Sequence, residues 1–150
     1  MSRRLEGKRA VITGGGRGIG RAIALAFVEE GASCVVTSRQ LEDLEATAEL
    51  APAGAIEPIA CDVSNDASVA AMSGLVLDKF GGVDIVVNNA GVHAAGSFLE
   101  IDPATYSRLY EVNVVGIVRI SQAFLTGMIE RGRGSIINMA STAGLFESPG

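Results

Sequence analysis

The sequence predicts an α/β protein built on a doubly wound parallel sheet with helices on both faces. Segments of strand and helix character alternate regularly along its 150 residues. The strand segments, such as Asp84–Val87 and Ser135–Ile137, are continuously apolar after their first residue, as parallel strands covered on both faces usually are. A glycine-rich octet, Thr13–Gly20, joins the first apolar run to an amphipathic helical segment. No linker or internal repeat divides the chain, so we expect one domain.

Each element is predicted from its periodicity and its end signals. The expected strands are Arg9–Thr13, Ser33–Ser38, Ala55–Ala60, Val83–Val87 and Ser135–Met139. The expected helices are Gly18–Glu30, Leu41–Leu50, Asn65–Phe80 and a long helical region from Asp102 to about Arg131. Pro52 closes the second helix, while Asp102 is a good N-cap with Pro103 at the first helical position.

The strand order follows from the handedness of the crossovers. Right-handed crossovers place the first strand at the centre of the sheet, the second and third on one side, and the fourth and fifth on the other. The carboxyl ends of the strands then meet at one edge, where such sheets bind ligands. The polar or glycine-rich segments at this edge are Gly14–Gly20, Ser38-Arg39, Cys61–Val63, Asn88–Gly91 and Ala140-Ser141. We therefore predict a ligand site there.

The octet Thr13–Gly20 has the character of a phosphate-binding turn. Its glycines allow a tight bend and close approach of the backbone, and the free N–H groups at the positive end of the following helix face an anion. The spacing matches neither Gly-x-Gly-x-x-Gly nor a loop that ends in Gly-Lys-Ser/Thr. The alternative is a glycine-rich turn between strand and helix that binds nothing.

Composition excludes several classes of protein. The net charge of −5 leaves no electrostatic footprint for nucleic acid and no polybasic patch for a membrane, and the apolar residues come in short runs. Residues are 48% hydrophobic and only 19% charged, so disorder is not expected. The apolar stretch after the basic N-terminus is cut short by glycines and cannot form a signal peptide. We expect a cytoplasmic protein that acts on small molecules.

Cysteine and histidine usage argues against a metal site. Cys34 and Cys61 lie in apolar, strand-like segments and lack Cys-x-x-Cys spacing. His93, which follows the Asn88–Gly91 turn, is the only histidine. We expect two buried, reduced thiols and no metal.

Four separated motifs together resemble one family. They are Thr13–Gly20, Asn88–Gly91, Asn113 within Glu111–Val114, and Asn138–Ser141 ahead of Thr142-Ala143-Gly144. In this order and spacing they resemble the N-terminal part of a short-chain dehydrogenase/reductase. The resemblance covers essentially all of the chain, and it implies that residues 1–150 are a Rossmann-like NAD(P)-binding domain.

The resemblance also implies the residues that bind the coenzyme. They are Gly14, Gly18, Ile19 and Gly20 around the pyrophosphate, Asp62 and Val63 at the adenine, and Asn89, Ala90 and Gly91 beside the adenosine ribose. For Asp62 the residues themselves allow an alternative, because an aspartate here can simply close a turn or cap the helix before Asp66.

The end of the second strand favours NADP over NAD. A carboxylate at this place would bind the ribose 2′-hydroxyl and repel a 2′-phosphate. Here the strand ends in the uncharged Ser38, Arg39 follows, and Arg17 projects from the glycine-rich turn toward the same region. Two guanidinium groups can pair a phosphate. The alternative is that either arginine is a solvated surface charge, and the motif tolerates arginine at position 17 in NAD-using relatives as well.

Two residues are candidates for the catalytic machinery. Ser141 matches the family's active-site serine, whose hydroxyl would bond the substrate oxygen; it is not a nucleophile, because no Gly-x-Ser-x-Gly elbow surrounds it. Asn113 lies in an apolar helix, where a buried amide must be paired. It is either a satisfied core amide that kinks the helix or, as the resemblance implies, the residue whose backbone carbonyl holds a proton-relay water.

The family's proton donor is a tyrosine in Tyr-x-x-x-Lys, and no such motif occurs in residues 1–150. Tyr106 and Tyr110 are the only tyrosines, and neither has a lysine four residues later. Ile136 and Ile137 would also form a bare apolar edge strand. We therefore expect an incomplete domain, truncated after the fifth strand, which is inactive on its own.

These observations predict an NADP(H)-dependent oxidoreductase that acts on a small-molecule carbonyl or alcohol. The sequence does not identify that substrate. The resemblance implies a homotetramer or homodimer with the helix from Asp102 to Arg131 at one interface. Two alternatives stay open: a dinucleotide-binding redox sensor or scaffold without catalysis, and a protein interaction module that binds no nucleotide.

Overall fold

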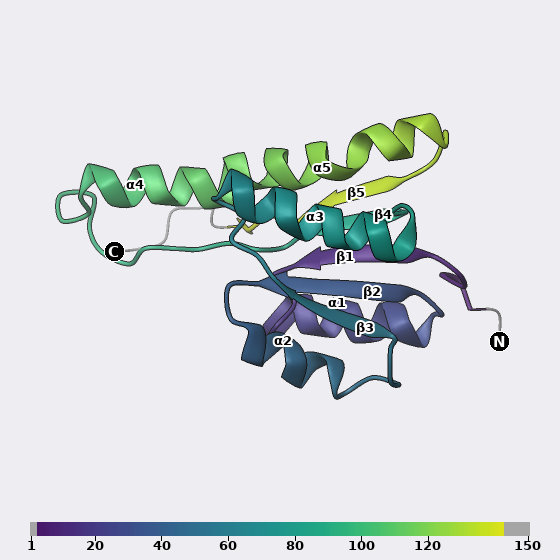
Figure 1. Ribbon diagram of the computed structural model, residues 1–150. Helices are drawn as coiled ribbons and strands as arrows, with labels where there is room; N and C mark the ends of the chain where they lie inside the picture. Colours follow the sequence, from purple (N-terminus) through teal and green to yellow (C-terminus); the bar gives the residue numbers. More distant parts are fainter. Residues whose placement is uncertain (1–2, 143–150) are drawn as a thin grey trace.

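The computed structural model describes residues 3–142, in which strands and helices alternate as predicted (Figure 1). The strands are β1 (Arg9–Thr13), β2 (Ser33–Ser38), β3 (Ile56–Ala60), β4 (Ile85–Asn88) and β5 (Ser135–Asn138). The helices are α1 (Gly18–Glu29), α2 (Leu41–Ala48), α3 (Asp66–Phe80), α4 (Pro103–Tyr110), the π-helical turn η1 (Glu111–Val115) and α5 (Gly116–Glu130). The observed ends differ from the expected ones by up to two residues. Shifts of two residues occur at the end of α2, which stops at Ala48 instead of Leu50, and at the start of β4, where the Val83 carbonyl accepts from Arg131.

The five strands form one parallel sheet in the order β3-β2-β1-β4-β5. This is the predicted order, with β1 at the centre. Each crossover carries a helix over a face of the sheet, which confirms the doubly wound Rossmann-like fold. The carboxyl ends of β1, β2, β3 and β4 therefore lie along one edge, where the chain turns away from the sheet (Figure 1).

Alternate side chains of each strand enter two separate cores, because successive residues of a strand point to opposite faces. On one face Val11, Val35 and Val86 pack against α3 and α5. On the other face Ile12 and Val36 pack against α1 and α2. The two faces are thus covered by different helices, as Figure 1 shows. Continuously apolar strands are what such a double burial requires.

Local signals set the helix ends. The Asn65 side chain caps α3 by accepting from the Ser68 N–H at 2.9 Å, and Gly81 ends this helix in the left-handed region at φ 66°. Asp102 caps α4 through the Thr105 N–H at 2.6 Å, as predicted. The long helix is not uniform, however, because a π-helical turn at Glu111–Val115 separates α4 from α5.

The segment Pro103–Glu130 is 28 residues long and contains an 18-residue window with a mean hydropathy of 1.5, so by length and composition alone it could cross a membrane. The expectation that apolar residues come only in short runs is wrong for this helix. Its apolar residues serve two faces. Ile120, Phe124 and Met128 are buried against the sheet, as in the core helix of a globular domain. A second stripe of apolar side chains on the same helix is exposed.

Strand β5 forms one edge of the described sheet. The expectation of a bare apolar edge holds for only one of its two isoleucines. Ile136 packs against the core beneath α5, whereas Ile137, which points to the opposite face, is 42% exposed.

Candidate functional site

The glycine-rich turn between β1 and α1 is shaped by contacts within the protein. Gly14 has a φ of 67°, a left-handed conformation that suits glycine, and its N–H donates to the Thr37 carbonyl at 2.7 Å. A Cβ on Gly20 would overlap the Gly14 carbonyl oxygen. Gly18 differs, because a Cβ there would meet no atom within 4 Å. The turn is therefore closed on its protein side and open at Gly18.

The end of β4 holds this turn in place. Asn89 Nδ2 donates to the carbonyl oxygens of Thr13 at 3.1 Å and Gly14 at 3.2 Å. The Thr13 hydroxyl in turn accepts from the N–H groups of Asn89 at 3.0 Å and Ala90 at 2.9 Å. These bonds join the first motif, Thr13–Gly20, to the second, Asn88–Gly91, at the ends of the adjacent strands β1 and β4. Asn89 and Ala90 thus hold the turn in place through hydrogen bonds.

A second support, which the sequence did not reveal, comes from α2. The buried Thr47 hydroxyl lies 3.1 Å from the Gly15 carbonyl oxygen and 3.2 Å from that of Gly16, and it accepts from Arg21 Nε at 2.9 Å. Arg21 also donates to the Gly16 carbonyl. A threonine inside a short helix and an arginine on α1 carry no signal of this role in the sequence.

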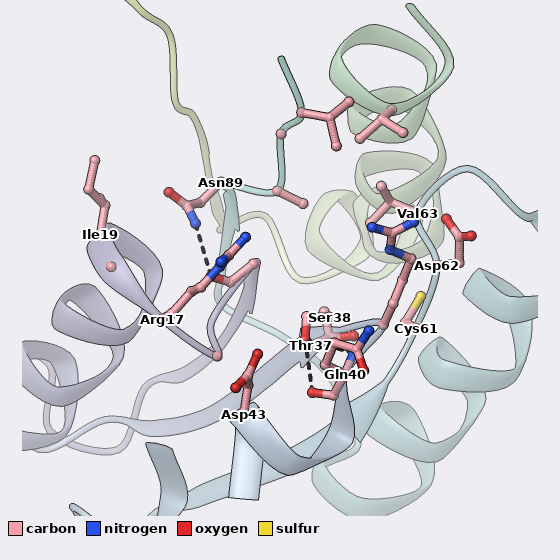
Figure 2. Close-up of a pocket in the computed structure, with 18 residues that line it drawn as sticks. Arg17, Ile19, Thr37, Ser38, Gln40, Asp43, Cys61, Asp62, Val63 and Asn89 are labelled. Atoms are coloured by element: carbon pink, nitrogen blue, oxygen red, sulfur yellow. Dashed lines mark hydrogen bonds between the residues drawn. The ribbon is translucent and has the colours of Figure 1, made fainter. Parts of the chain in front are cut away.

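A cleft of about 580 Å³ opens along the carboxyl edge of the sheet (Figure 2). Every residue predicted to bind the coenzyme lines it, with one exception. Those that line it are Gly14, Arg17, Gly18, Ile19, Ser38, Arg39, Asp62, Val63, Asn89, Ala90 and Gly91. The exception is Gly20, whose part is to let α1 approach the turn. Gly16 and Cys61, which belong to segments expected at this edge, also line the cleft. The residues that the sequence did not indicate are Thr37, Gln40, Asp43, Val92 and Val112.

Positive charge collects where β2 ends. Arg17 and Arg39 both line the cleft, and neither guanidinium group forms an ion pair or hydrogen bond with any residue of 3–142. Arg9 and Arg119, by contrast, are paired with carboxylates. Between the two free arginines Ser38 closes a tight turn, its hydroxyl contacting the Gln40 carbonyl oxygen at 3.2 Å and the Gln40 N–H at 3.3 Å.

Asp62 occupies the end of β3 with its carboxylate partly engaged. Its Oδ1 accepts from the Ser64 N–H at 2.9 Å and from the Ser64 hydroxyl at 2.6 Å. The hydrogen bond from the Ser64 hydroxyl is the largest reason that the pKa of Asp62 is lowered, and the charges of Arg39 and Arg119 act in the same direction. The turn that the residues alone suggested is therefore present, while the N-cap of α3 is Asn65 instead.

Neither cysteine is a ready nucleophile or metal ligand, because burial disfavours the thiolate of both. Both cysteines are free and buried, as predicted. Burial raises the pKa of Cys34 to about 12, and burial likewise raises the pKa of Cys61, which lines the cleft. Within residues 3–142 no group of three or more metal-binding side chains comes together.

Comparison with known proteins agrees with this geometry. Residues 8–150 match the family model described as short chain dehydrogenase. The chain belongs to the short-chain dehydrogenase family.

Individual relatives share the family's N-terminal portion with this chain. It is 46% identical over 143 residues to the sorbitol dehydrogenase of Cereibacter sphaeroides, covering 94% of this chain and 55% of that protein. It is 37% identical over 147 residues to a 3-oxoacyl-[acyl-carrier-protein] reductase of Vibrio cholerae, covering 97% and 59%. The crystal structure of a short-chain type dehydrogenase/reductase from Mycobacterium marinum superposes with a TM-score of 0.91 at 33% identity, covering 99% and 62%. The chain thus spans between 55% and 62% of the length of these three proteins.

Asn113 lies outside the cleft and is hydrogen-bonded to a residue of the cleft wall, Val92. Its side chain accepts from the Val92 N–H and donates to the Val92 carbonyl, both at 2.8 Å. It is thus the satisfied amide that one of the two interpretations proposed. It also lies within the π-helical turn, which is the predicted departure from a regular helix. Asn113 itself does not line the cleft. Its bonding partner Val92 and its neighbour in the helix, Val112, do.

Ser141 follows β5 and does not line the cleft. The end of β5 is nonetheless fixed beside that of β4, because the Met139 N–H donates to the Asn88 carbonyl at 2.9 Å and Asn88 Nδ2 donates to Asn138 Oδ1 at 2.8 Å. Ser141 therefore leaves the sheet next to the Asn88–Gly91 turn. The Ala143-Gly144 end of this motif lies outside the described residues.

Proposed function

We propose that the protein is an oxidoreductase that uses NADP(H) to transfer hydride between the nicotinamide ring and a carbonyl or secondary alcohol carbon of a small molecule. Membership of the short-chain dehydrogenase family supports the class of reaction. The relatives named above include a sorbitol dehydrogenase and a 3-oxoacyl-[acyl-carrier-protein] reductase, one named for an alcohol substrate and one for a ketone.

The shape of the glycine-rich turn fits a pyrophosphate. Space is open at Gly18, the first residue of α1, so a ligand can reach the N–H groups at the helix end. Neither the turn Gly14–Arg17 nor the first turn of α1 contains an acidic residue of its own. Gly14, Gly18 and Ile19 would hold the pyrophosphate, while Asp62 and Val63 would lie at the adenine.

The observation that carries the proposal is the pair of guanidinium groups, Arg17 and Arg39, that line the cleft without an ion-pair partner in residues 3–142. Structural arginines usually find a carboxylate or carbonyl partner, as Arg9 does here. Two free arginines beside the uncharged Ser38 favour a ligand with a phosphate, so we infer a preference for NADP over NAD.

Residues of the chain would orient the reacting groups. NADPH, when bound, supplies the hydride. The Ser141 hydroxyl would donate a hydrogen bond to the substrate oxygen, on which negative charge develops as the carbonyl is reduced. Asn113, through its two bonds to Val92, would keep the wall after Gly91 in place. Stabilisation of the oxyanion by one such donor contributes about 3 kcal/mol in enzymes that use it.

Titration of the complete protein with NADP⁺ and NAD⁺ tests the coenzyme. Arg39→Asp should weaken NADP⁺ binding about 10- to 100-fold, because it removes a charge-assisted hydrogen bond and adds repulsion, and it should change NAD⁺ binding little. Arg108→Asp is the matched control, since Arg108 is an exposed arginine on α4 outside the cleft. If neither coenzyme saturates the wild-type protein, the proposed function is wrong.

Turnover tests the catalytic part. Ser141→Ala should lower kcat for carbonyl reduction about 100-fold while the affinity for NADPH stays within about twofold. A protein that binds NADPH but reduces no carbonyl in a panel of ketones, aldehydes and thioester-bound 3-oxoacyl groups would instead be a redox sensor or scaffold.

We also infer assembly into a homodimer or homotetramer through α4 and α5. Support comes from the exposed apolar stripe on these helices, which we define as Tyr106, Tyr110, Val114, Val118, Leu125 and Ile129. Most of these residues lie four positions apart, on one side of the helix. A contiguous exposed patch of this kind marks an interface more often than free surface. A cytoplasmic location stays a prediction from the sequence.

A further inference from the structure

Besides Asp62, a second acidic side chain lines the cleft near Arg17 and Arg39. Asp43, in the first turn of α2, borders the cleft together with Arg17, Ser38 and Arg39. Figure 2 shows its carboxylate directed from α2 into the cleft, on the side of the glycine-rich turn and Arg17. The amphipathic pattern of α2 gives no hint of this position, because Glu42 and Glu45 beside it are simply exposed.

Packing fixes Asp43 against the glycine-rich turn. A Cβ on Gly16 would lie 2.8 Å from the Cβ of Asp43, so the two backbones pass at van der Waals contact. The Thr47 hydroxyl, one helical turn along α2, lies 3.0 Å from the Asp43 carbonyl oxygen and reaches the carbonyls of the turn as well. The backbone of Asp43 is therefore held in a fixed position beside the cleft.

The Asp43 carboxylate has no charge partner. Within residues 3–142 it forms no ion pair and no side-chain hydrogen bond, and the same holds for Arg17 and Arg39. The other carboxylate of the cleft, Asp62, is engaged by Ser64. The charge of Arg39 acts on Asp62 as well, whereas Arg17 and Asp43 line the cleft beside the glycine-rich turn without a partner in residues 3–142.

We propose that Asp43 is a specificity-determining residue that weakens the preference of this cleft for a 2′-phosphorylated dinucleotide. The proposal rests on the function proposed above. A 2′-phosphate carries between one and two negative charges and is repelled by Asp43 while it is attracted by the arginines. A free ribose 2′-hydroxyl is uncharged, so Asp43 does not repel it and can accept its hydrogen bond. The protein would therefore retain measurable affinity for NAD beside NADP.

The expected effect is modest because Asp43 is exposed to solvent. Exposed charge pairs are screened, and removing one such charge changes an affinity by about two- to fivefold. Asp43→Asn should tighten NADP⁺ by about this factor and leave NAD⁺ unchanged or slightly weaker. Asp43→Lys, which reverses the charge, should raise the NADP⁺/NAD⁺ affinity ratio by about tenfold or more.

The experiment measures the dissociation constants of NADP⁺ and NAD⁺ for the complete protein and its variants by calorimetry, at about 0.05 M and about 0.5 M salt. Glu42→Gln and Glu42→Lys are the matched controls. Glu42 lies in the same first turn of α2 and makes the same contribution to the helix dipole, but it does not line the cleft. Thermal unfolding of each variant checks that α2 is intact.

A rise in the NADP⁺/NAD⁺ ratio in the order wild type, Asp43→Asn, Asp43→Lys, smaller at high salt and absent in the Glu42 variants, supports the proposal. An unchanged ratio in both Asp43 variants, or an equal rise in the Glu42 variants, overturns it. A wild-type protein that prefers NAD⁺ would contradict the coenzyme preference proposed above without deciding this point, which depends only on the change at position 43. Binding of neither coenzyme overturns both.

Discussion

The side chain of Asn113 forms two 2.8 Å hydrogen bonds with the backbone of Val92, one as acceptor and one as donor. The helix that carries Asn113 is thereby tied to the loop that leaves β4. Since Val92 lines the cleft, this pair connects the π-helical turn to the shape of the site.

Replacing Asn113 with alanine should therefore cost both stability and affinity. The Val92 N–H and carbonyl would lose their partners, and two unsatisfied polar groups in a partly buried place cost about 2 kcal/mol or more. We expect the urea midpoint of unfolding to fall accordingly and the Kd for NADP⁺ to rise several-fold. Ser107→Ala is the control, because its hydroxyl bonds only the Pro103 carbonyl on exposed α4. Equal effects of the two variants would contradict the prediction.

Gly20 should tolerate no side chain. In Gly20→Ala the new Cβ would overlap the Gly14 carbonyl oxygen, a backbone atom held by Asn89, so the turn or α1 must move. We expect a loss of about 2 kcal/mol or more in the free energy of unfolding.

Gly74 provides the opposite case on α3, because an added Cβ there meets nothing within 4 Å. Gly74→Ala should stabilise the protein by about 0.5 to 1 kcal/mol, through helix propensity. Chemical denaturation of Gly20→Ala and Gly74→Ala measures the change in the free energy of unfolding for each variant. A stable Gly20→Ala protein would show that the turn adapts more easily than its packing indicates.

The ion pair of Asp84 with Arg9 should make stability depend on acid pH. Burial disfavours the Asp84 carboxylate, but the bonds from the side chain and N–H of Arg9 and the charges of Arg9 and Arg133 outweigh it, so the pKa of Asp84 is lowered. A depressed pKa in the folded state contributes stability above the ordinary value of 3.8. That contribution is lost as the pH falls through the folded pKa.

Asp84→Asn should therefore destabilise the protein by about 3 kcal/mol near neutral pH and flatten the acid limb of the curve of stability against pH. Asp78→Asn, at an exposed position of α3, is the control. Denaturant titrations at a series of pH values below about 6 measure both curves. Parallel curves for the wild type and Asp84→Asn would refute the linkage.

The sequence predicted the features that depend on local pattern and chain order. Continuous apolar runs located the strands, and crossover handedness placed β1 at the centre, so the segments after β1, β2, β3 and β4 were expected at one edge. This alone brought Gly14, Ser38, Asp62 and Asn89 into one cleft. Neighbouring strand ends in a parallel sheet are fixed by topology rather than by side-chain detail.

What the sequence did not predict depends on the packing of one element on another. Asp43 and Thr47 look like ordinary residues of a short amphipathic helix until α2 is seated against the glycine-rich turn. Asn113 finds its partner 21 positions earlier in the chain, and nothing near either residue specifies that pair. Gly20 was assigned to the ligand, whereas its contact is with the Gly14 carbonyl, because a motif shows that a glycine is needed but not which atom lies opposite.

The last prediction concerns the exposed stripe on α4 and α5. Val118 lies within it and is 47% exposed, while the opposite side of the helix is buried at Ile120 and Phe124. If the stripe is an interface between copies of the protein, Val118→Glu should bury a charge there and shift the assembly toward monomers. Leu75→Glu is the control, because Leu75 is similarly exposed, at 58%, but on α3. Light scattering after size-exclusion chromatography measures the mass of each variant, and an unchanged oligomer in Val118→Glu, together with a monomer in Leu75→Glu, would move the interface to α3.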